Sequence, residues 1–194
     1  MPSGDNLLAT LALFDPAAAS AEEWQTYHRF RQLRHEEESP DEPHTPDDVV
    51  ERRLKLGDPY SKEQRWLWQR GDEVVAEVWA STLTPASPEY ESSRHLLFAD
   101  AWVLGPARRQ GVGRGSLPAL LSVMEETGAR LLTADTCDES GKAFLQWLGA
   151  APRYSEARSR LDLRLVDWEM VGRWVREGRS ARRPGACRSR YRPV

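Results

Sequence analysis

The chain has 194 residues, with 27 Lys and Arg against 30 Asp and Glu, a formal net charge of −3, and 40% hydrophobic residues. This length fits one domain with some residues left over, and the apolar fraction is sufficient for a buried core. The apolar runs fall short of a membrane span, the N-terminus lacks the basic start of a secretory signal, and two cysteines make neither a disulfide scaffold nor a metal site. We therefore expect a cytoplasmic protein that binds no metal.

Two charge blocks of opposite sign lie behind the small net charge. Residues 35–51 carry eight acids and no Lys or Arg, whereas residues 176–194 carry seven Arg and one Glu. The local charge of +6 in the second block leaves −9 for the other 175 residues. We therefore expect no nucleic-acid binding by these 175 residues, because phosphate binding needs a basic surface. We expect the basic end to be a solvated tail, with a nucleic-acid-binding module as the minor alternative.

The N-terminal residues predict a strand followed by a helix. Leu7–Phe14 is an apolar segment of strand length. Ser20 and Glu23 have the spacing of a capping box, in which each side chain accepts a hydrogen bond from the other residue's backbone N–H. The helix that they open has large side chains at helical spacing, which we expect in the core: Trp24, Tyr27, Phe30 and Leu33.

A second helix and a β-hairpin are predicted next. The Thr45 hydroxyl can cap a helix whose first residue is a proline, and Gly57 ends it. Gln64–Gln69 and Glu73–Thr82 predict two strands joined by a tight turn. Residues 83–93, with two prolines and many small polar side chains, predict a loop.

The C-terminal half alternates strands and helices. Arg94–Leu104 predicts a strand, Leu117–Met124 a buried helix face, and Arg130–Ala134 another strand. Ser140–Leu148 predicts a further helix, and Arg153–Leu165 predicts one or two final strands. The expected fold class is therefore α/β, with a mixed central β-sheet flanked by helices.

A glycine-rich segment lies between the strand that ends at Leu104 and the next helix. Glycines let backbone N–H groups approach a phosphate closely, and a helix N-terminus attracts negative charge. The segment has no Lys for a Walker loop, and its glycines alternate without the final interval of a Rossmann fingerprint. It predicts an anion site of another kind, with a strand-to-helix turn that binds no ligand as the alternative.

The order Val103-x-x-Pro106-x-Arg108-x-x-Gly111-x-Gly113 resembles motif A of the GNAT (Gcn5-related) N-acetyltransferases. Ala143–Gly149 is similar to the Phe-containing helix end that follows this motif in the family, although Ala150 stands where the family has Phe. The resemblance covers residues 5–165 and implies the GNAT fold with acetyl-CoA as co-substrate, its pyrophosphate held by backbone amides. It implies these acetyl-CoA-binding residues: Trp102, Val103, Arg108, Arg109, Gln110, Gly111, Val112, Gly113, Arg114, Gly115 and Ser116.

The chemistry of acetyl transfer requires a group that takes a proton from the attacking amine. Asp100 is the leading candidate, because it lies on the strand before the loop, where several GNAT enzymes for small amines carry an acid. The alternative is an Asp100 that faces solvent or forms an ion pair. Glu77 and His95 are weaker candidates. Many family members carry a Tyr beside the helical Phe as a general acid, but Phe144-Leu145-Gln146 has no hydroxyl, so Tyr154 is the expected substitute.

These residues predict an enzyme that transfers an acetyl group from acetyl-CoA to a primary amine, expected to be a small molecule, by direct attack. The alternative is a non-catalytic acyl-CoA-binding or regulatory domain. Because direct transfer needs no acyl-enzyme, we expect Cys137 to be a small buried residue. The acidic segment 35–51 weakly favours a cationic amine, and it fits equally a solvated loop. The resemblance also makes a homodimer the oligomer to test.

The residues after 165 resemble the join in actinobacterial tandem GNAT proteins. There a second acetyltransferase domain would begin. The simpler interpretation of Trp168–Val175 is a short amphipathic helix, followed by the Arg-rich end of the segment 166–194.

Overall fold

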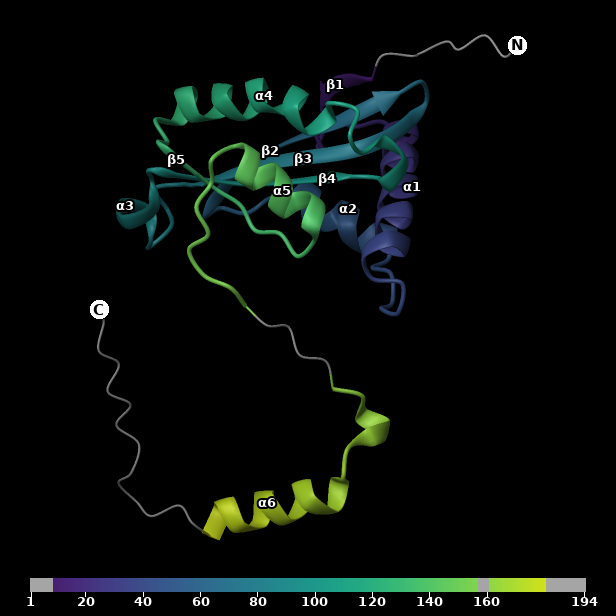
Figure 1. Cartoon of the computed structure of the whole chain (residues 1–194), viewed down its shortest axis with the longest axis vertical. Helices are drawn as coiled ribbons and strands as arrows, with labels where there is room; N and C mark the ends of the chain where they lie inside the picture. Colours follow the sequence, from purple (N-terminus) through teal and green to yellow (C-terminus); the bar gives the residue numbers. More distant parts are fainter. Residues whose placement is uncertain (1–8, 157–160, 181–194) are drawn as a thin grey trace. The chain divides into compact units, whose positions relative to one another are not determined.

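The computed structural model describes residues 9–156 and 161–180 (Figure 1). The chain divides into two compact units, residues 1–149 and residues 150–194.

A five-stranded sheet organises the first unit, with its strands in the order β1-β2-β3-β4-β5. Neighbouring strands are antiparallel from β1 to β4, whereas β4 and β5 are parallel, so the sheet is mixed as the sequence predicts. The parallel pair requires a crossover, which the intervening helix α4 supplies. The strands are β1 (Thr10–Leu13), β2 (Ser61–Arg70), β3 (Glu73–Leu83), β4 (Leu96–Val103) and β5 (Leu131–Thr133).

In residues 9–149, the described part of this unit, five α-helices and one 3-10 turn accompany the sheet. They are α1 (Ala21–Glu38), α2 (Asp47–Leu56), α3 (Tyr90–Ser93), the 3-10 turn η1 (Gly105–Ala107), α4 (Val112–Thr127) and α5 (Glu139–Trp147). The capping box at the start of α1 is confirmed, with both reciprocal hydrogen bonds between Ser20 and Glu23 present. The cap predicted for α2 is wrong. Pro46 takes the N-cap position, which places the Thr45 hydroxyl one residue too early to cap, and no side chain caps the helix.

Two apolar clusters cover opposite faces of the sheet, with α1 and α2 along one side and α4 along the other (Figure 1). Successive side chains of a strand point to opposite faces, so β2 contributes Leu67 to the α1 side and Trp66 to the α4 side. The cluster on the α1 side is Phe14, Trp24, Tyr27, Phe30, Val50, Leu67, Val74 and Leu104. The same alternation places Glu77 and Asp100 on the α1 side.

Several expectations need correction. Leu33, expected in the core with the three aromatic residues of α1, is exposed. The segment 83–93 contains the short helix α3, and Cys137 is exposed. Arg153–Leu165 forms no strand in its described residues: 153–156 are irregular and 163–165 form a 3-10 turn, while 157–160 lie outside the description. In that turn the Asp162 side chain accepts a hydrogen bond from the Arg164 N–H, which competes with an extended backbone.

The second unit contains one α-helix among its described residues, α6 (Trp168–Ser180). The Arg-rich residues 181–194, and with them the expectation of a solvated tail, lie outside the described part of the chain. No helix in residues 9–156 or 161–180 is both long and apolar enough to cross a membrane.

Candidate active site

The glycine-rich segment forms the turn that enters α4. Gly111 is the N-cap of this helix, and its φ of 85° lies in the left-handed region that favours glycine. It has no side chain to cap the helix, and the first turn carries no acid. The first intrahelical bond of the turn runs from the Gly115 N–H to the Gly111 carbonyl (2.8 Å). The N–H groups of residues 112–114, which precede that bond, therefore have no intrahelical acceptor and suit an anion.

The Arg108 side chain stabilises this turn through polar contacts. Its Nε donates to the Val103 carbonyl (2.8 Å), and its Nη2 lies 3.2 Å from the Glu37 carboxylate. Glu37 also accepts from the Gly105 N–H (2.9 Å). The guanidinium carbon of Arg108 lies 5.4 Å from the centre of the Trp102 ring. The side chain of Arg108 is thus committed to the turn itself.

The other polar side chains of the segment differ in whether they have hydrogen-bond partners. The Gln110 amide donates to the Pro106 carbonyl (2.7 Å) and accepts from Arg70 (2.6 Å). Arg109, which has a φ of 62°, and Arg114 are exposed, and neither side chain has a partner within residues 9–156 or 161–180. The free positive side chains at the entrance of α4 are therefore Arg109 and Arg114.

The next glycines of the segment pack closely against aromatic rings. A Cβ on Gly113 would lie 3.1 Å from the Phe144 ring of α5, and one on Gly115 would lie 2.8 Å from the Trp68 ring of β2. Ser116 is 1% exposed, with its hydroxyl accepting from Trp68 Nε1 (2.8 Å) and donating to the Val112 carbonyl (3.0 Å). The structure therefore places Ser116 against the sheet. Sequence reasoning missed Trp68 as the partner that fixes this turn.

The pairing between strands β4 and β5 ends before the turn. Their last pair is Phe98 with Thr133, after which β4 continues to Val103 without a β5 partner. Asp100, Trp102 and Val103 lie in this unpaired half. His95 lies before β4 and about 16 Å from Asp100 along the strand direction, with its carbonyl accepting from the first residues of the β5 segment. Asp100 is thus on the part of β4 that an extended ligand can approach, and His95 is not.

A buried charge network lies next to Asp100. Glu77 is 2% exposed; its carboxylate accepts from the Tyr27 hydroxyl (2.8 Å), from Arg34 Nη1 (3.2 Å) and from Arg65. Arg34 Nη2 also lies 3.8 Å from the Asp100 carboxylate. The cross-strand pairs Glu77–Trp102 and Trp79–Asp100 place both acids on the face that α1 covers. The structure thus joins the leading and one weaker candidate through Arg34.

Sequence reasoning missed Arg34 and Arg65. One signal for Arg34 was available, because it follows Tyr27 and Phe30 at helical spacing and therefore continues the buried face of α1. A charged side chain on such a face requires a partner in the core. For Arg65 the strand alternation gave a similar signal, since it lies two residues before the buried Leu67.

Burial raises the pKa of the Asp100 carboxyl, and Arg34 opposes this effect while Glu77 and Asp135 add to it. The Tyr27 hydroxyl has a raised pKa as well, first because of burial and then because of the Glu77 charge. Asp100 therefore holds a proton more readily than an ordinary aspartate, which is the property that a proton acceptor requires.

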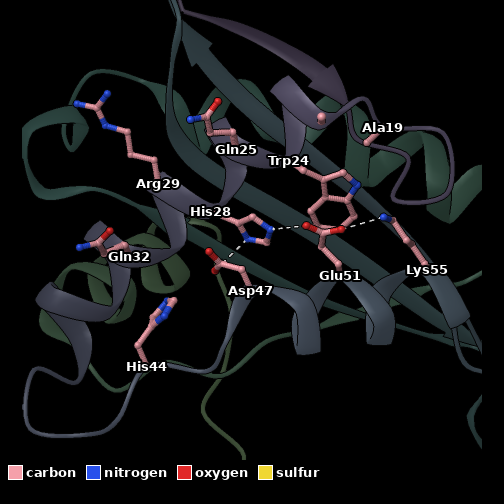
Figure 2. A pocket seen from close by; sticks show the side chains of 11 residues that line it. Ala19, Trp24, Gln25, His28, Arg29, Gln32, His44, Asp47, Glu51 and Lys55 are labelled. Carbon is pink, nitrogen blue, oxygen red and sulfur yellow. Dashed lines mark hydrogen bonds and ion pairs between the residues drawn. The ribbon is translucent and has the colours of Figure 1, made fainter.

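A cavity of about 1010 Å³ opens on the α1 face beside this network. Glu77, Arg34 and Trp79 line one part of it, and the end of α2 with the start of β2 lines another. A second cavity of about 710 Å³ lies between α1 and α2 (Figure 2). There His28 is placed between the carboxylates of Asp47 (3.2 Å) and Glu51 (3.0 Å). Glu77 is the one sequence-predicted candidate that lines the first cavity, and none lines the second; Asp100 is not among the lining residues of either.

Tyr154 and Cys137 belong to other segments of the chain than the residues described so far. Tyr154 belongs to the second unit, so the description of the first unit does not include it. Cys137 lies in the connection between β5 and α5. Within the described ranges 9–156 and 161–180, no group of three or more His, Cys, Asp or Glu side chains could hold a metal ion.

Comparison with known proteins adds a family and a fold. The family model described as the acetyltransferase (GNAT) family matches residues 27–150. Among curated proteins none matches the chain in sequence.

Three solved structures illustrate the likeness. An aminoglycoside acetyltransferase from an uncultured soil metagenomic sample, in complex with sisomicin, superposes with a TM-score of 0.57 at 14% identity, over 81% of this chain and 99% of that one. A ribosomal-protein-alanine N-acetyltransferase from Brucella melitensis biovar Abortus 2308 gives a TM-score of 0.54 at 19% identity, over 79% and 100%. A tandem GNAT protein from the clavulanic acid biosynthesis pathway gives 0.57 at 17% identity, over 73% of this chain and 43% of that one. At these identities the likeness establishes the fold alone.

Proposed function

Because the chain belongs to the acetyltransferase (GNAT) family, we propose that it transfers an acetyl group from acetyl-CoA to a primary amine by direct attack. The observation that carries this proposal is the uncapped N-terminus of α4 beside the unpaired half of β4. The first supplies N–H donors for a pyrophosphate, and the second supplies backbone groups for an extended pantetheine arm.

The chain's residues fit acetyl-CoA in two respects. Gly111 leaves the entrance of α4 open, and the exposed Arg109 and Arg114 add positive charge beside it. Arg108 positions this entrance through Val103 and Glu37, so we assign it a positioning role. Bound there, acetyl-CoA supplies the activated thioester carbonyl.

Asp100 is the proposed proton acceptor. An ammonium has no lone pair, so the acceptor amine must lose one proton before its nitrogen can form the new C–N bond, and it loses a second as the C–S bond breaks. The raised pKa of Asp100 favours uptake of the first proton, and the departing thiolate needs one proton as well. Arg34, 3.8 Å from Asp100, holds this carboxylate on the cavity side of β4.

A non-catalytic acyl-CoA-binding domain is the second candidate. The resemblance implies a Tyr hydroxyl next to Phe144, whose ring packs beside Gly113. No hydroxyl stands there, and this favours the non-catalytic candidate. Thioester consumption with a panel of primary amines separates the two functions. Binding of acetyl-CoA without turnover of any amine would favour the second.

The tandem GNAT match also supports a proposal about organisation. The superposition covers 73% of this chain but 43% of that protein. We propose that residues 5–165 correspond to one acetyltransferase domain of such a pair, with α6 in the segment that follows it.

Gly111→Asp tests the cofactor site. Aspartate tolerates a left-handed φ better than most residues, and open space surrounds the position, so the fold should persist. Its carboxylate would repel a phosphate at the α4 entrance, and we expect loss of acetyl-CoA binding by calorimetry. Gly128→Asp is the matched control, because Gly128 has a φ of 72° and open space at the other end of α4. Unchanged binding by the Gly111 variant would refute the site.

A further inference from the structure

The Trp102 ring of β4 contacts two guanidinium groups that belong to different parts of the site. The guanidinium carbon of Arg34 lies 5.0 Å from the centre of the ring, and that of Arg108 lies 5.4 Å from it. Arg34 is also 3.8 Å from the Asp100 carboxylate, whereas Arg108 donates to the Val103 carbonyl in the turn that enters α4. One aromatic ring therefore meets both the cation beside the proposed proton acceptor and the cation that stabilises the proposed acetyl-CoA site.

The register of the sheet explains this position. Trp102 pairs with Glu77 across β3 and β4 and lies two residues after Asp100, so all three side chains share the face that α1 covers. Arg34 reaches them from α1, with its Nη1 donating to Glu77 (3.2 Å) and its Nε donating to Glu38 (3.1 Å). The nitrogen nearest to Asp100 is the remaining one, Nη2. The placing of this guanidinium therefore decides how strongly a positive charge acts on Asp100.

The second guanidinium belongs to the α4 entrance. Arg108 Nη2 lies 3.2 Å from Glu37, which also accepts from the Gly105 N–H (2.9 Å). Glu37 and Glu38 are neighbours in α1, so the last turn of one helix supplies a carboxylate to each arginine. The Trp102 Nε1–H is buried and has no hydrogen-bond partner in residues 9–156 and 161–180. What this side chain offers to both arginines is therefore the face of its ring.

Both contacts are partly shielded from water. The side chain of Arg34 is 25% exposed and that of Arg108 is 33% exposed. An aromatic ring attracts a guanidinium electrostatically, and it does so more strongly where water is partly excluded. Without the ring, both arginines keep their carboxylate partners but have more freedom to move.

We propose that Trp102 is a positioning residue that links the two halves of the site: its ring holds Arg34 beside the proton acceptor and Arg108 in the turn that receives acetyl-CoA. The inference rests on the proposed acetyl transfer. It assigns Trp102 a role other than the direct contact with acetyl-CoA that the sequence resemblance implies. With the ring in place, Arg34 favours the ionised form of Asp100, which is the form that can take a proton from an amine.

Several groups act on the Asp100 carboxylate from the elements around it. Burial raises the pKa of Asp100, and Arg34 of α1 opposes this effect. The Ala101 N–H, which donates to the carboxylate (2.8 Å), lowers the pKa as well. Glu77 of β3 and Asp135, which follows β5, raise it. Because Arg34 is the cation of this set, a displaced guanidinium leaves a carboxylate that ionises only at a higher pH.

Trp102→Leu removes the ring and keeps an apolar side chain. We expect the acid limb of the pH–rate profile to move up by about half a unit to one unit, because a less constrained Arg34 stabilises the Asp100 carboxylate less. We also expect the Kd for acetyl-CoA to rise about threefold to tenfold, as the loss of a cation–π contact to Arg108 predicts. Trp102→Phe keeps a smaller aromatic face and should change both quantities less.

Trp24→Phe is the matched control for Trp102→Phe. The Trp24 ring also has a cation over it, Lys55 at 5.0 Å, and its Nε1 is likewise buried without a hydrogen-bond partner among the described residues. It belongs to the apolar cluster against which Trp102 packs. Because its cation takes no part in the proposed site, this variant should leave the acid limb and the Kd at their wild-type values, even where it lowers stability.

A double-mutant cycle tests whether the ring acts through Arg34. Arg34→Met alone should move the acid limb up by about one unit, as the loss of a cation close to a carboxylate predicts. In the Trp102→Leu background the same substitution should move it by less, because the guanidinium is already displaced. Arg34→Lys, which keeps the charge, should give a smaller shift than Arg34→Met. Equal shifts in the two backgrounds would overturn the proposal that Trp102 positions Arg34.

Failure of the inference and failure of the proposed function give different results. The titration of the Asp100 carboxyl, followed by NMR of the side-chain carboxyl carbon and assigned with Asp100→Asn, does not depend on turnover. If Trp102→Leu changes neither this titration nor the Kd for acetyl-CoA, or changes only one of them, the link through Trp102 is refuted while acetyl transfer stands. If it changes both but neither protein acetylates any primary amine, acetyl transfer is refuted and the positioning role of Trp102 stands.

Discussion

Glu77→Gln removes the one buried carboxylate that holds Arg34 and Arg65 in place. The substitution keeps the shape of the side chain and a hydrogen-bond acceptor for Tyr27, so it changes mainly the charge. Arg65 is only 12% exposed and Arg34 25% exposed. Both guanidinium groups therefore lose a charge-assisted hydrogen bond in surroundings where water replaces it poorly.

The size of the effect follows from these two contacts. A hydrogen bond to a charged group is worth about 1.5–3 kcal/mol, which sets an upper limit of about 3–6 kcal/mol for the pair. Arg34 keeps Glu38 and Asp100 as partners, and Arg65 keeps Glu63. We therefore expect a loss of about 2–4 kcal/mol in the free energy of unfolding. With a urea m-value of about 2 kcal/mol/M, the midpoint should fall by about 1–2 M.

Urea unfolding followed by tryptophan fluorescence measures this loss. Glu63→Gln is the matched control, because Glu63 is 45% exposed and has a single contact of 3.5 Å with Arg65. That variant should lose less than about 1 kcal/mol. A Glu77→Gln midpoint within experimental error of the control would refute the claim that the network stabilises the α1 face. The acid limb of the pH–rate profile should also move to lower pH, because Glu77 helps to raise the pKa of Asp100.

Three further predictions concern the site and its support. Asp100→Asn should lower turnover at least tenfold with acetyl-CoA affinity unchanged. Because burial raises the folded-state pKa of Asp100, ionising it opposes folding, so the variant should be no less stable at pH 7, and its stability relative to the wild type should decline as the pH falls through the carboxyl pKa. Gly115→Ala places a Cβ 2.8 Å from Trp68 and should lower the free energy of unfolding in urea by about 1–3 kcal/mol. In Gly57→Ala the new Cβ meets no atom within 4 Å, so this variant loses only the ease with which glycine adopts a positive φ. Trp68→Phe should cost about 1 kcal/mol through the lost hydrogen bond to Ser116, and an equal loss in the double variant with Ser116→Ala would confirm the coupling.

Local signals predicted most of the fold. The capping box opens α1 where Ser20 and Glu23 indicate, because both of its hydrogen bonds form between residues three apart. The hairpin of β2 and β3 follows from alternation around a tight turn, and Gly111 and Gly128 bound α4 through their left-handed backbone. The prediction of one or two strands in Arg153–Leu165 was wrong in the described residues, where Asp162 caps a 3-10 turn at Leu163–Leu165.

The site was less predictable, because its contacts join residues that are far apart in the chain. The motif indicates which residues surround the entrance of α4, and the comparisons agree on the family. It does not indicate that Glu37, 71 residues before Arg108, takes up that guanidinium. Nor does it indicate that Trp68 explains why position 115 is glycine. Residues at the same motif spacing can therefore bind a ligand, hold the loop in place or pack against a neighbouring side chain. Only the tertiary contacts of each residue show which of these roles it has.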